Sequence, residues 1–253
     1  MCCRYSCTLE NSEICEALAV ERTENARLWN PRVNVSPATV NPIVCVKDGQ
    51  VTLDAMRWGL VRDTPTFNCR IESLETLKPI WSCAKSHRAI AVMNGYYEWQ
   101  YGKTVEKTPY YFTTDGPVVC ALAIWKDGEE RTYSILTMPA TAKLAKVHPR
   151  MPILVTYQNA LKWIKGSWPE VLAIKESFIE PSFYRVSTKI NVAGNQDASL
   201  VNPIKTFDMA AWTRKDKATT SNEAKRKPEP VGNNAIEIQR GKKVKMEKKK
   251  DPE

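Results

Sequence analysis

Gly-containing turn dipeptides between short apolar runs are the feature that most restricts the fold of this chain. Four of them occur, at Asp48-Gly49, Asn94-Gly95, Asp115-Gly116 and Asp127-Gly128. The flanking runs are 43–46 and 51–58, 88–92 and 96–99, 110–113 and 118–125, and finally 132–138. Asp-Gly and Asn-Gly favour tight type I′ turns, which join antiparallel neighbours. The sequence therefore predicts four antiparallel hairpins.

Helical patterns are fewer and shorter than the strand patterns. They cover segments 12–20, 73–82, 141–146, 157–164 and 169–177. Strands that pair with their sequence neighbours, combined with scattered helices, indicate an α+β fold. We expect a single domain built on a predominantly antiparallel, barrel-like β-sheet with peripheral helices. A chain of 253 residues with 43% hydrophobic residues can form the core that such a domain needs.

The last part of the chain differs in composition from the rest. Residues 213–253 hold thirteen Lys/Arg and seven Asp/Glu, which gives them +6 of the total net charge of +9. Because this segment has no aromatic residue and is rich in charged and polar residues, we expect a folded domain at 1–212 and a disordered basic tail at 213–253. The basic runs at 225–228 and 242–245 are typical of nuclear localisation signals, although a solvated, non-specific tail has the same composition.

The spacing of the cysteines and the small number of histidines argue against a metal site. The eight cysteines include no C-x-x-C pair, and there are only two histidines, so we expect no metal and no cofactor. The sequence lacks an apolar run of membrane-spanning length, and a charge interrupts the first residues where a signal peptide would be apolar. We therefore expect an intracellular protein with free thiols and no membrane partner.

Cys2 directly follows the initiator Met1. Removal of Met1 would leave a free α-amine and a thiol on adjacent carbons. Such a 1,2-aminothiol condenses with an aldehyde to a Schiff base, and the thiol then closes a five-membered thiazolidine ring. Reference pKa values of about 7.7–8.0 for the amine and about 8.5 for the thiol leave a reactive fraction of each near neutral pH.

Glu98 stands in the aromatic segment 95–99. Strand alternation would place Glu98 and Tyr96 on one face, and Tyr97 and Trp99 on the other. A carboxylate among aromatic rings would have a raised pKa and could act as a general acid or base. The alternative is an exposed strand glutamate whose aromatic neighbours turn inward.

Other candidate residues each have a functional and a structural interpretation. His148 is followed by Pro149 and Pro152, which could restrict the backbone and fix its imidazole, or it is an ordinary loop histidine. Asn68 could orient a reacting group and Arg70 could bind phosphate, or the two form a loop cap and a surface ion pair with Glu72. Trp58 could stack on a base, or it is a core residue.

Taken in order, these segments resemble the SOS-response-associated peptidase (SRAP) family. The resemblance is carried over residues 2–205 by Met1-Cys2-x-Arg4, Asn34-x-Ser36-Pro37, Arg57-Trp58-Gly59-Leu60, Asn68-x-Arg70-x-Glu72, Gly95-Tyr96-Tyr97-Glu98-Trp99 and His148-x-Arg150-Met151-Pro152. It implies a protein that senses and shields abasic sites in single-stranded DNA by forming a covalent thiazolidine with the ring-opened sugar aldehyde. It also implies autocatalytic removal of Met1.

The resemblance assigns roles to individual residues. Cys2 matches the nucleophile, and Glu98 matches the carboxylate that assists ring opening, Schiff-base chemistry and reversal. His148 and Asn68 match residues that line the same site. The residues that match DNA-binding positions, or lie in the matching segments and are assigned with them, are Arg4, Asn34, Trp58, Arg70 and Arg150.

The chain also departs from the family pattern. Cys3 stands where the family usually has Gly, which would affect how closely DNA packs beside the nucleophile. The segment 186–195 lacks the Arg that usually lies near Gly194. The tail contains no PCNA-binding motif, and we expect a monomer.

Two other functions remain open at this point. The first is an N-terminal-nucleophile cysteine peptidase, with Cys2 as the attacking thiol and His148 as its base. The second is a non-catalytic nucleic-acid-binding module that uses the basic tail. A covalent abasic-site enzyme needs both the amine and the thiol of Cys2, the peptidase needs the thiol, and the binding module needs neither.

Overall fold

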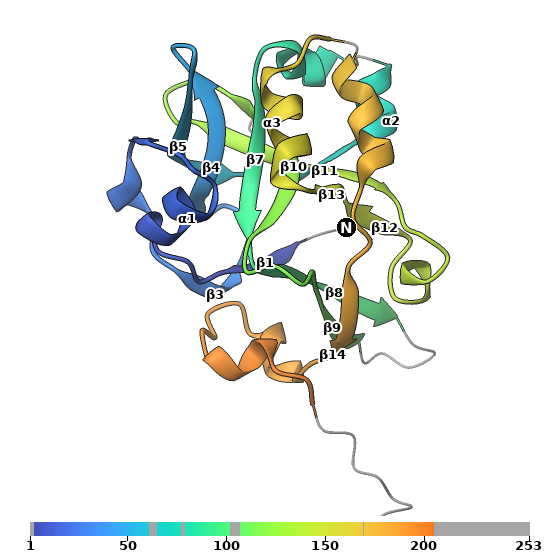
Figure 1. The fold of residues 1–253 in the computed structure, drawn as a ribbon. Helices are drawn as coiled ribbons and strands as arrows, with labels where there is room; N and C mark the ends of the chain where they lie inside the picture. Colours follow the sequence, from blue (N-terminus) through green and yellow to red (C-terminus); the bar gives the residue numbers. More distant parts are fainter. Residues whose placement is uncertain (1–2, 61–64, 77–78, 102–106, 169, 205–253) are drawn as a thin grey trace, which may run out of the picture. The chain divides into compact units, whose positions relative to one another are not determined.

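The computed structural model describes residues 3–60, 65–76, 79–101, 107–168 and 170–204. They form two β-sheets with short helices around them (Figure 1). The first sheet has five strands in the order β14-β9-β8-β1-β3, with bounds Ser182–Arg185, Lys107–Thr113, Gly95–Tyr101, Arg4–Cys7 and Arg32–Val35. Every pairing within it is antiparallel.

The second sheet closes on itself. Its order is β12-β11-β10-β7-β4-β5-β2, with bounds Arg150–Pro152, Thr132–Pro139, Val119–Lys126, Arg88–Met93, Val40–Lys47, Gln50–Trp58 and Arg22–Thr23. β5 also pairs with β11, so β11, β10, β7, β4 and β5 form a ring. β6 (Asn68–Arg70) pairs with β11, and β13 (Leu154–Val155) pairs with β10. The prediction of a barrel-like, mainly antiparallel α+β fold is confirmed.

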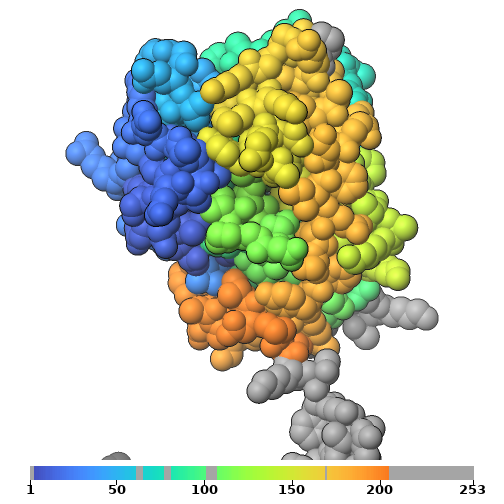
Figure 2. Space-filling view, in the orientation of Figure 1, coloured from blue at the N-terminus to red at the C-terminus, as the bar shows by residue number. Residues whose placement is uncertain are grey.

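Three α-helices and several 3₁₀ turns flank the sheets. The α-helices are α1 (Asn11–Ala17), α2 (Ile71–Glu75) and α3 (Tyr157–Lys165). The 3₁₀ segments are Ala26–Leu28, Pro79–Lys85, Leu144–Lys146, Glu170–Ser177, Thr188–Asn191 and Ala198–Val201. Figure 2 shows α3 in yellow and the following 3₁₀ segment in light orange covering much of one face. None of the described helices is long and apolar enough to cross a membrane.

The helix predictions differ from the structure mainly in helix type. The segments predicted at 12–20 and 157–164 are α1 and α3, and Thr156 caps α3 by accepting a bond from the N–H of Asn159. The segment predicted at 73–82 is split between α2 and a 3₁₀ turn, and the segment at 169–177 is 3₁₀ over its described residues. Short segments adopt 3₁₀ geometry readily, because it needs fewer residues per turn.

Two of the four predicted hairpins are confirmed. Asp48-Gly49 joins β4 to β5, and Asp127-Gly128 lies between β10 and β11, with both pairs antiparallel. The hairpins predicted at Asn94-Gly95 and Asp115-Gly116 are wrong. β7 and β10 belong to the second sheet, whereas β8 and β9 belong to the first, so these two dipeptides lie where the chain changes sheet.

Packing explains why these turns do not form hairpins. All six residues of β7 are buried, which is typical of a central strand covered on both faces. Asn94 joins the two corners, because its side chain accepts a bond from the N–H of Thr8 and donates one to the carbonyl of Pro117. A Cβ on Gly95 would lie 2.4 Å from the carbonyl oxygen of Phe112, so β8 and β9 approach too closely there for another residue.

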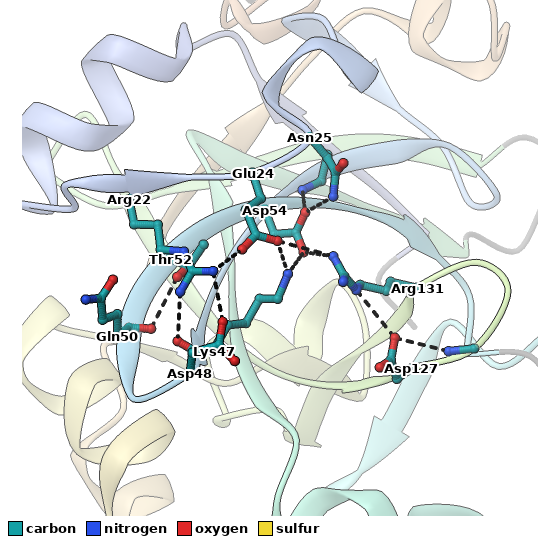
Figure 3. Close-up of polar contacts among 12 residues, drawn as sticks. Arg22, Glu24, Asn25, Lys47, Asp48, Gln50, Thr52, Asp54, Asp127 and Arg131 are labelled. Carbon is teal, nitrogen blue, oxygen red and sulfur yellow. Dashed lines mark hydrogen bonds and ion pairs between the residues drawn. The ribbon is translucent and has the colours of Figure 1, made fainter.

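A buried carboxylate, Asp54 on β5, connects β5 with β4 and with the turn before β11 (Figure 3). Its side chain has no exposed surface. It accepts hydrogen bonds from Asn25 at 2.8 Å, Lys47 at 3.2 Å and Arg131 at 2.7 Å, and from the N–H of Ala55 at 2.8 Å. These bonds tie β4, β5 and the end of the β10–β11 turn to one buried charge.

Arg88 is a buried cation on the α3 side of the same sheet, where it donates hydrogen bonds to main-chain carbonyls. Its buried guanidinium donates to the carbonyl oxygens of Trp163 and Gly166, both at 2.6 Å, and of Ala84 at 3.2 Å. These carbonyls lie at the end of α3 and of the 3₁₀ segment Pro79–Lys85. A cation is favourable there because the last carbonyls of a helix have no partner within the helix and carry a partial negative charge.

Candidate active site

A hollow of about 500 Å³ lies where β1 and β9 begin and β8 approaches its end. It is lined by Cys3, Arg4, Glu98, Trp99, Lys107, His148 and Asn191. Arg4 pairs with Tyr97 across antiparallel strands, so the chain enters β1 beside the part of β8 that carries Glu98. The hollow therefore combines the beginning of the domain with the aromatic strand.

Glu98 is buried and points away from its aromatic neighbours Tyr97 and Trp99. Tyr96 packs in the main core, whereas Tyr97 belongs to a second, smaller core, as alternation predicted. Only 3% of Glu98 is exposed, so the alternative of an exposed strand glutamate is wrong. Burial raises the pKa of the Glu98 carboxyl to about 7. A carboxyl with this pKa exchanges protons readily near neutral pH.

His148 faces the same hollow and approaches Glu98. Its Nδ1 lies 3.8 Å from Oε1 of Glu98. The same nitrogen is 2.9 Å from the carbonyl oxygen of Arg150 and 3.1 Å from its N–H, so either neutral tautomer finds a backbone partner. Burial lowers the pKa of the imidazole, which favours the neutral ring. Near neutral pH a partly protonated carboxyl thus lies beside an imidazole whose neutral form is favoured by burial.

Arg4 reaches the hollow from β1 and is anchored by Asn34. Its guanidinium donates to Oδ1 of Asn34 at 2.8 Å and to the carbonyl of Ile190 at 3.3 Å. The Asn34 amide donates in turn to the carbonyls of Val192 and Asn195. Asn34 is 1% exposed and its side chain bonds to protein groups, so the structure gives it a supporting position behind Arg4, and its direct contact with DNA stays a prediction. Its role is to hold Arg4 and segment 190–195 in place.

Arg70 and Arg150 have different surroundings. Arg150 forms a two-point ion pair with Glu72, at 2.6 and 3.0 Å, and donates to the carbonyl of Thr137 at 2.7 Å. The surface ion pair considered between Arg70 and Glu72 is thus replaced by one from Arg150. Arg70 is exposed at the end of β6 and can meet a ligand, whereas Arg150 would first have to leave Glu72.

Trp58 is a core residue. It has no exposed surface, its indole donates to the carbonyl of Phe67 at 2.9 Å, and its ring packs between Tyr5 and Tyr133. A ring buried on both sides offers no face to a nucleobase in this arrangement, which favours the core interpretation, and base stacking stays a prediction. Its burial follows from its position at the end of β5, where β5 meets β11 in the barrel ring.

Two predicted catalytic residues remain, Asn68 and Cys2. Asn68 is buried on β6 beside Ile135 of β11, and it is not among the residues that line the hollow. Cys2, the predicted nucleophile, lies outside the described residues, as does the expected boundary between 212 and 213. Cys3, the residue next to Cys2, is exposed and lines the hollow with a free thiol.

Three residues that line the hollow were not predicted as site residues from the sequence. Trp99 forms one wall and donates its indole N–H to Oδ1 of Asn191 at 2.7 Å. Lys107 adds a positive charge from the first position of β9. The position of Trp99 directly after Glu98, near the end of a predicted strand, could have identified it, although alternation places the two side chains on opposite faces. Asn191 comes from a distant 3₁₀ turn, and no local signal points to it.

Comparison with known proteins establishes the family of this chain. The family model of the SOS response associated peptidase (SRAP) matches residues 1–193, and the chain belongs to this family. One relative, the abasic site processing protein YedK of Escherichia coli, is 27% identical over 81% of this chain and 100% of its own length. Another, the abasic site processing protein HMCES of Xenopus tropicalis, is 25% identical over 77% of this chain and 76% of its own length.

A solved structure supports the fold independently. A protein from Bacteroides thetaiotaomicron superposes with a TM-score of 0.69 at 18% identity, covering 81% of this chain and all of that chain. At this identity the likeness concerns the fold alone. The family assignment places the Glu98 hollow on a scaffold that these proteins share.

Proposed function

We propose that this protein processes abasic sites in single-stranded DNA by capturing them covalently through Cys2. The observation that carries the proposal is the buried Glu98 carboxyl, with a pKa of about 7, lying 3.8 Å from the imidazole of His148 in a hollow that Cys3 also lines. The names of the relatives as abasic site processing proteins point in the same direction.

The proposed reaction proceeds in two steps after Met1 is removed by hydrolysis. The Cys2 amine adds to the sugar aldehyde and one water leaves, which gives a Schiff base. The Cys2 thiol then adds to the same carbon, the C=N bond becomes a single bond, and the thiol proton passes to the nitrogen. The product is a thiazolidine, and the net change is the loss of one water.

Glu98 and His148 would move the protons that these steps require. In its protonated form Glu98 can donate to the departing water, and in its ionised form it can accept a proton from the amine or thiol. A neutral His148 can polarise the same intermediates without adding a repelling charge beside the protonated amine. Arg4 and Lys107 would attract the phosphates on either side of the gap, and Arg70 would add a contact outside the hollow.

The decisive experiment concerns the amine of Cys2. The protein is incubated with single-stranded DNA treated with uracil glycosylase, and adducts are followed on denaturing gels before and after hydroxylamine. Intact mass gives the state of Met1. We expect a hydroxylamine-resistant adduct from protein that begins at Cys2. Cys2→Ala should give at most a labile Schiff base that borohydride traps.

A blocked N-terminus separates the mechanisms. An uncleavable extension before Cys2 keeps the thiol but converts the amine to an amide, so the stable adduct should disappear. Cys3 cannot replace Cys2, because its nitrogen is already in a peptide bond. A resistant adduct formed by the blocked protein would refute the aminothiol mechanism and favour thiol chemistry of the peptidase kind, with His148 as base.

The basic tail completes the proposal. Residues 213–253 would strengthen non-covalent contact with DNA and direct the protein to the nucleus through the runs at 225–228 and 242–245. Replacing the lysines and arginines of both runs with glutamine should make a fluorescent fusion lose any nuclear accumulation. Unchanged distribution would leave the tail as a general basic segment.

A further inference from the structure

The end of β8 contacts both walls of the hollow through consecutive residues. Trp99 donates to Asn191 on one side of the strand, as described above. Gln100 donates its amide N–H to the carbonyl oxygen of Lys146 at 2.7 Å. Since alternate residues of a strand share a face, Gln100 lies on the same side of β8 as Glu98. Lys146 precedes His148 by two residues, so this bond connects the strand of Glu98 with the loop of His148.

That loop, residues 140–149 between β11 and β12, forms an arch that is held by its own hydrogen bonds and lies close to the end of β8 (Figure 1). Its base is closed by the bond from the N–H of Ala140 to the carbonyl of Pro149 at 3.0 Å. The N–H of His148 donates to the carbonyl of Leu144 at 3.1 Å, and the Leu144 side chain is buried. These bonds hold the backbone of His148 in the arch, and its imidazole contacts the Arg150 backbone at the end of the arch, so its distance from Glu98 depends on how the arch sits against β8.

Other contacts of the arch lie on a different side. Thr141 bonds to Glu180, and Lys143 forms an exposed ion pair with the same carboxylate at 3.6 Å. They link the arch to the segment before β14 and not to β8. The bond from Gln100 to Lys146 therefore supports the arch from the β8 side, next to the approach of Glu98 to His148.

We propose that Gln100 is a positioning residue, which holds the arch of residues 140–149 against β8 so that the imidazole of His148 stays beside Glu98. The position of the His148 imidazole beside the Glu98 carboxyl is a matter of geometry alone, whereas an effect on crosslinking rests on the proposed function. Residues 98–100 of β8 then both supply the Glu98 carboxyl and set the position of its partner His148. An exposed hydrogen bond of this kind contributes little to global stability, so its loss should change the site more than the fold.

The test compares three variants of the full chain. Gln100→Leu removes the donor with little change in size, whereas Gln100→Lys keeps a donor long enough to reach the Lys146 carbonyl. Lys143→Gln is the matched control, because it breaks the exposed ion pair on the other side of the same arch. Thermal unfolding of each variant checks that the fold is retained.

The first measurement is the NMR titration of the histidine ring protons. The chain has only two histidines, and His87 serves as an internal reference. The groups that face His148 are Glu98 on β8, Arg150 on β12, and Arg4 and Lys107 across the hollow. None of these is changed in the three variants. Because burial lowers the pKa of His148, a loosened arch should raise this pKa in Gln100→Leu relative to the wild type.

The second measurement is the single-turnover crosslinking rate at saturating DNA. For Gln100→Leu we expect a fall of about three- to tenfold with an unchanged half-saturating DNA concentration, because misplacement affects the chemical step. Gln100→Lys should restore both readouts, and Lys143→Gln should leave both at wild-type values. Gln100→Leu with wild-type titration or wild-type rate, or failure of Gln100→Lys to restore them, would overturn the proposal. If the wild type forms no adduct, the proposed function fails, and the titration alone decides whether Gln100 positions His148.

Discussion

Replacing Glu98 with Gln should stabilise the protein at alkaline pH while it slows crosslinking. The substitution keeps the shape of the side chain but removes its charge. Glu98 is 3% exposed, and its ionised form is disfavoured because burial removes the water that would solvate the carboxylate. The wild-type protein therefore carries an energetic cost at this position that grows as the carboxyl ionises.

The sign and size of this cost follow from the pKa in the two states. Glu98 has an ordinary pKa of 4.5 and a folded value of about 7. Below 4.5 the carboxyl is protonated in both states and costs nothing. As the pH rises from 4.5 to 7 the unfolded chain ionises first, so stability is lost, and above 7 the full cost of about 3 kcal/mol is present. Between pH 5 and pH 8.5 the cost grows by about 2.5 kcal/mol.

Urea unfolding of the wild type and Glu98→Gln at pH 5 and pH 8.5 measures this directly. The stability of Glu98→Gln relative to the wild type should improve by about 2.5 kcal/mol between the two pH values. Glu129→Gln removes an exposed carboxylate and should show no comparable pH-dependent difference. Parallel stability–pH profiles for wild type and Glu98→Gln would mean that the folded pKa is ordinary. In the same variant, crosslinking should be slower by about 10²–10⁴-fold.

Three further changes test the scaffold and the tail. Burial alone would raise the pKa of Asp54, but hydrogen bonds from Asn25, Ala55 and Lys47 outweigh it and lower the pKa, so the stability this carboxylate provides is lost as pH falls through its folded value. Asp54→Asn should therefore cost about 3 kcal/mol at pH 7 and make acid unfolding less steep, as urea titrations across pH 3–7 would reveal. Arg88→Met leaves buried carbonyls without a donor and should lower the unfolding free energy by about 3 kcal/mol; a loss below about 1 kcal/mol would show that water replaces the guanidinium. Deleting 213–253 should preserve crosslinking of a short oligonucleotide but reduce the salt dependence of DNA binding, by about 0.7 in the log–log slope for each phosphate that the tail no longer neutralises; a folded truncation that fails to crosslink would contradict this.

The strands could be predicted from the sequence, but their partners only in part. Asp48-Gly49 and Asn94-Gly95 are equally good turn signals, yet only the first joins paired strands. The difference lies in burial: every residue of β7 is buried, so this strand pairs with β4 and β10 in the middle of the barrel. A turn dipeptide reports local backbone preference, whereas the choice of sheet depends on long-range packing that no short segment encodes.

A site residue could be predicted where its chemical type and the alternation of the strand point to the same role. Glu98 could be assigned to a buried face because alternation separates it from Tyr97 and Trp99. The surroundings of Trp58 and Asn34 could not be predicted, because a residue type alone does not say which way a side chain faces: an aromatic ring suits a base or a core, and an amide suits phosphate or a backbone carbonyl. Gln100 has no distinctive signal in the sequence at all, since its partner is a main-chain oxygen 46 positions away.

The position of the hollow follows from the way the chain changes sheets. Two of the connections between the sheets, near Asn94 and Pro117, lie at the Gly95 end of β8, where the close approach of β9 leaves no room for a Cβ. Glu98 lies three residues farther along β8, about 10 Å away at the rise of a β-strand. The tightly packed corner thus secures one end of β8, while the other end, which still pairs with β9, contacts the two walls of the hollow through the side chains of Trp99 and Gln100. A buried carboxyl that costs stability is best accommodated beside such an end, because side-chain contacts can adjust to a bound strand without disturbing the packed corner.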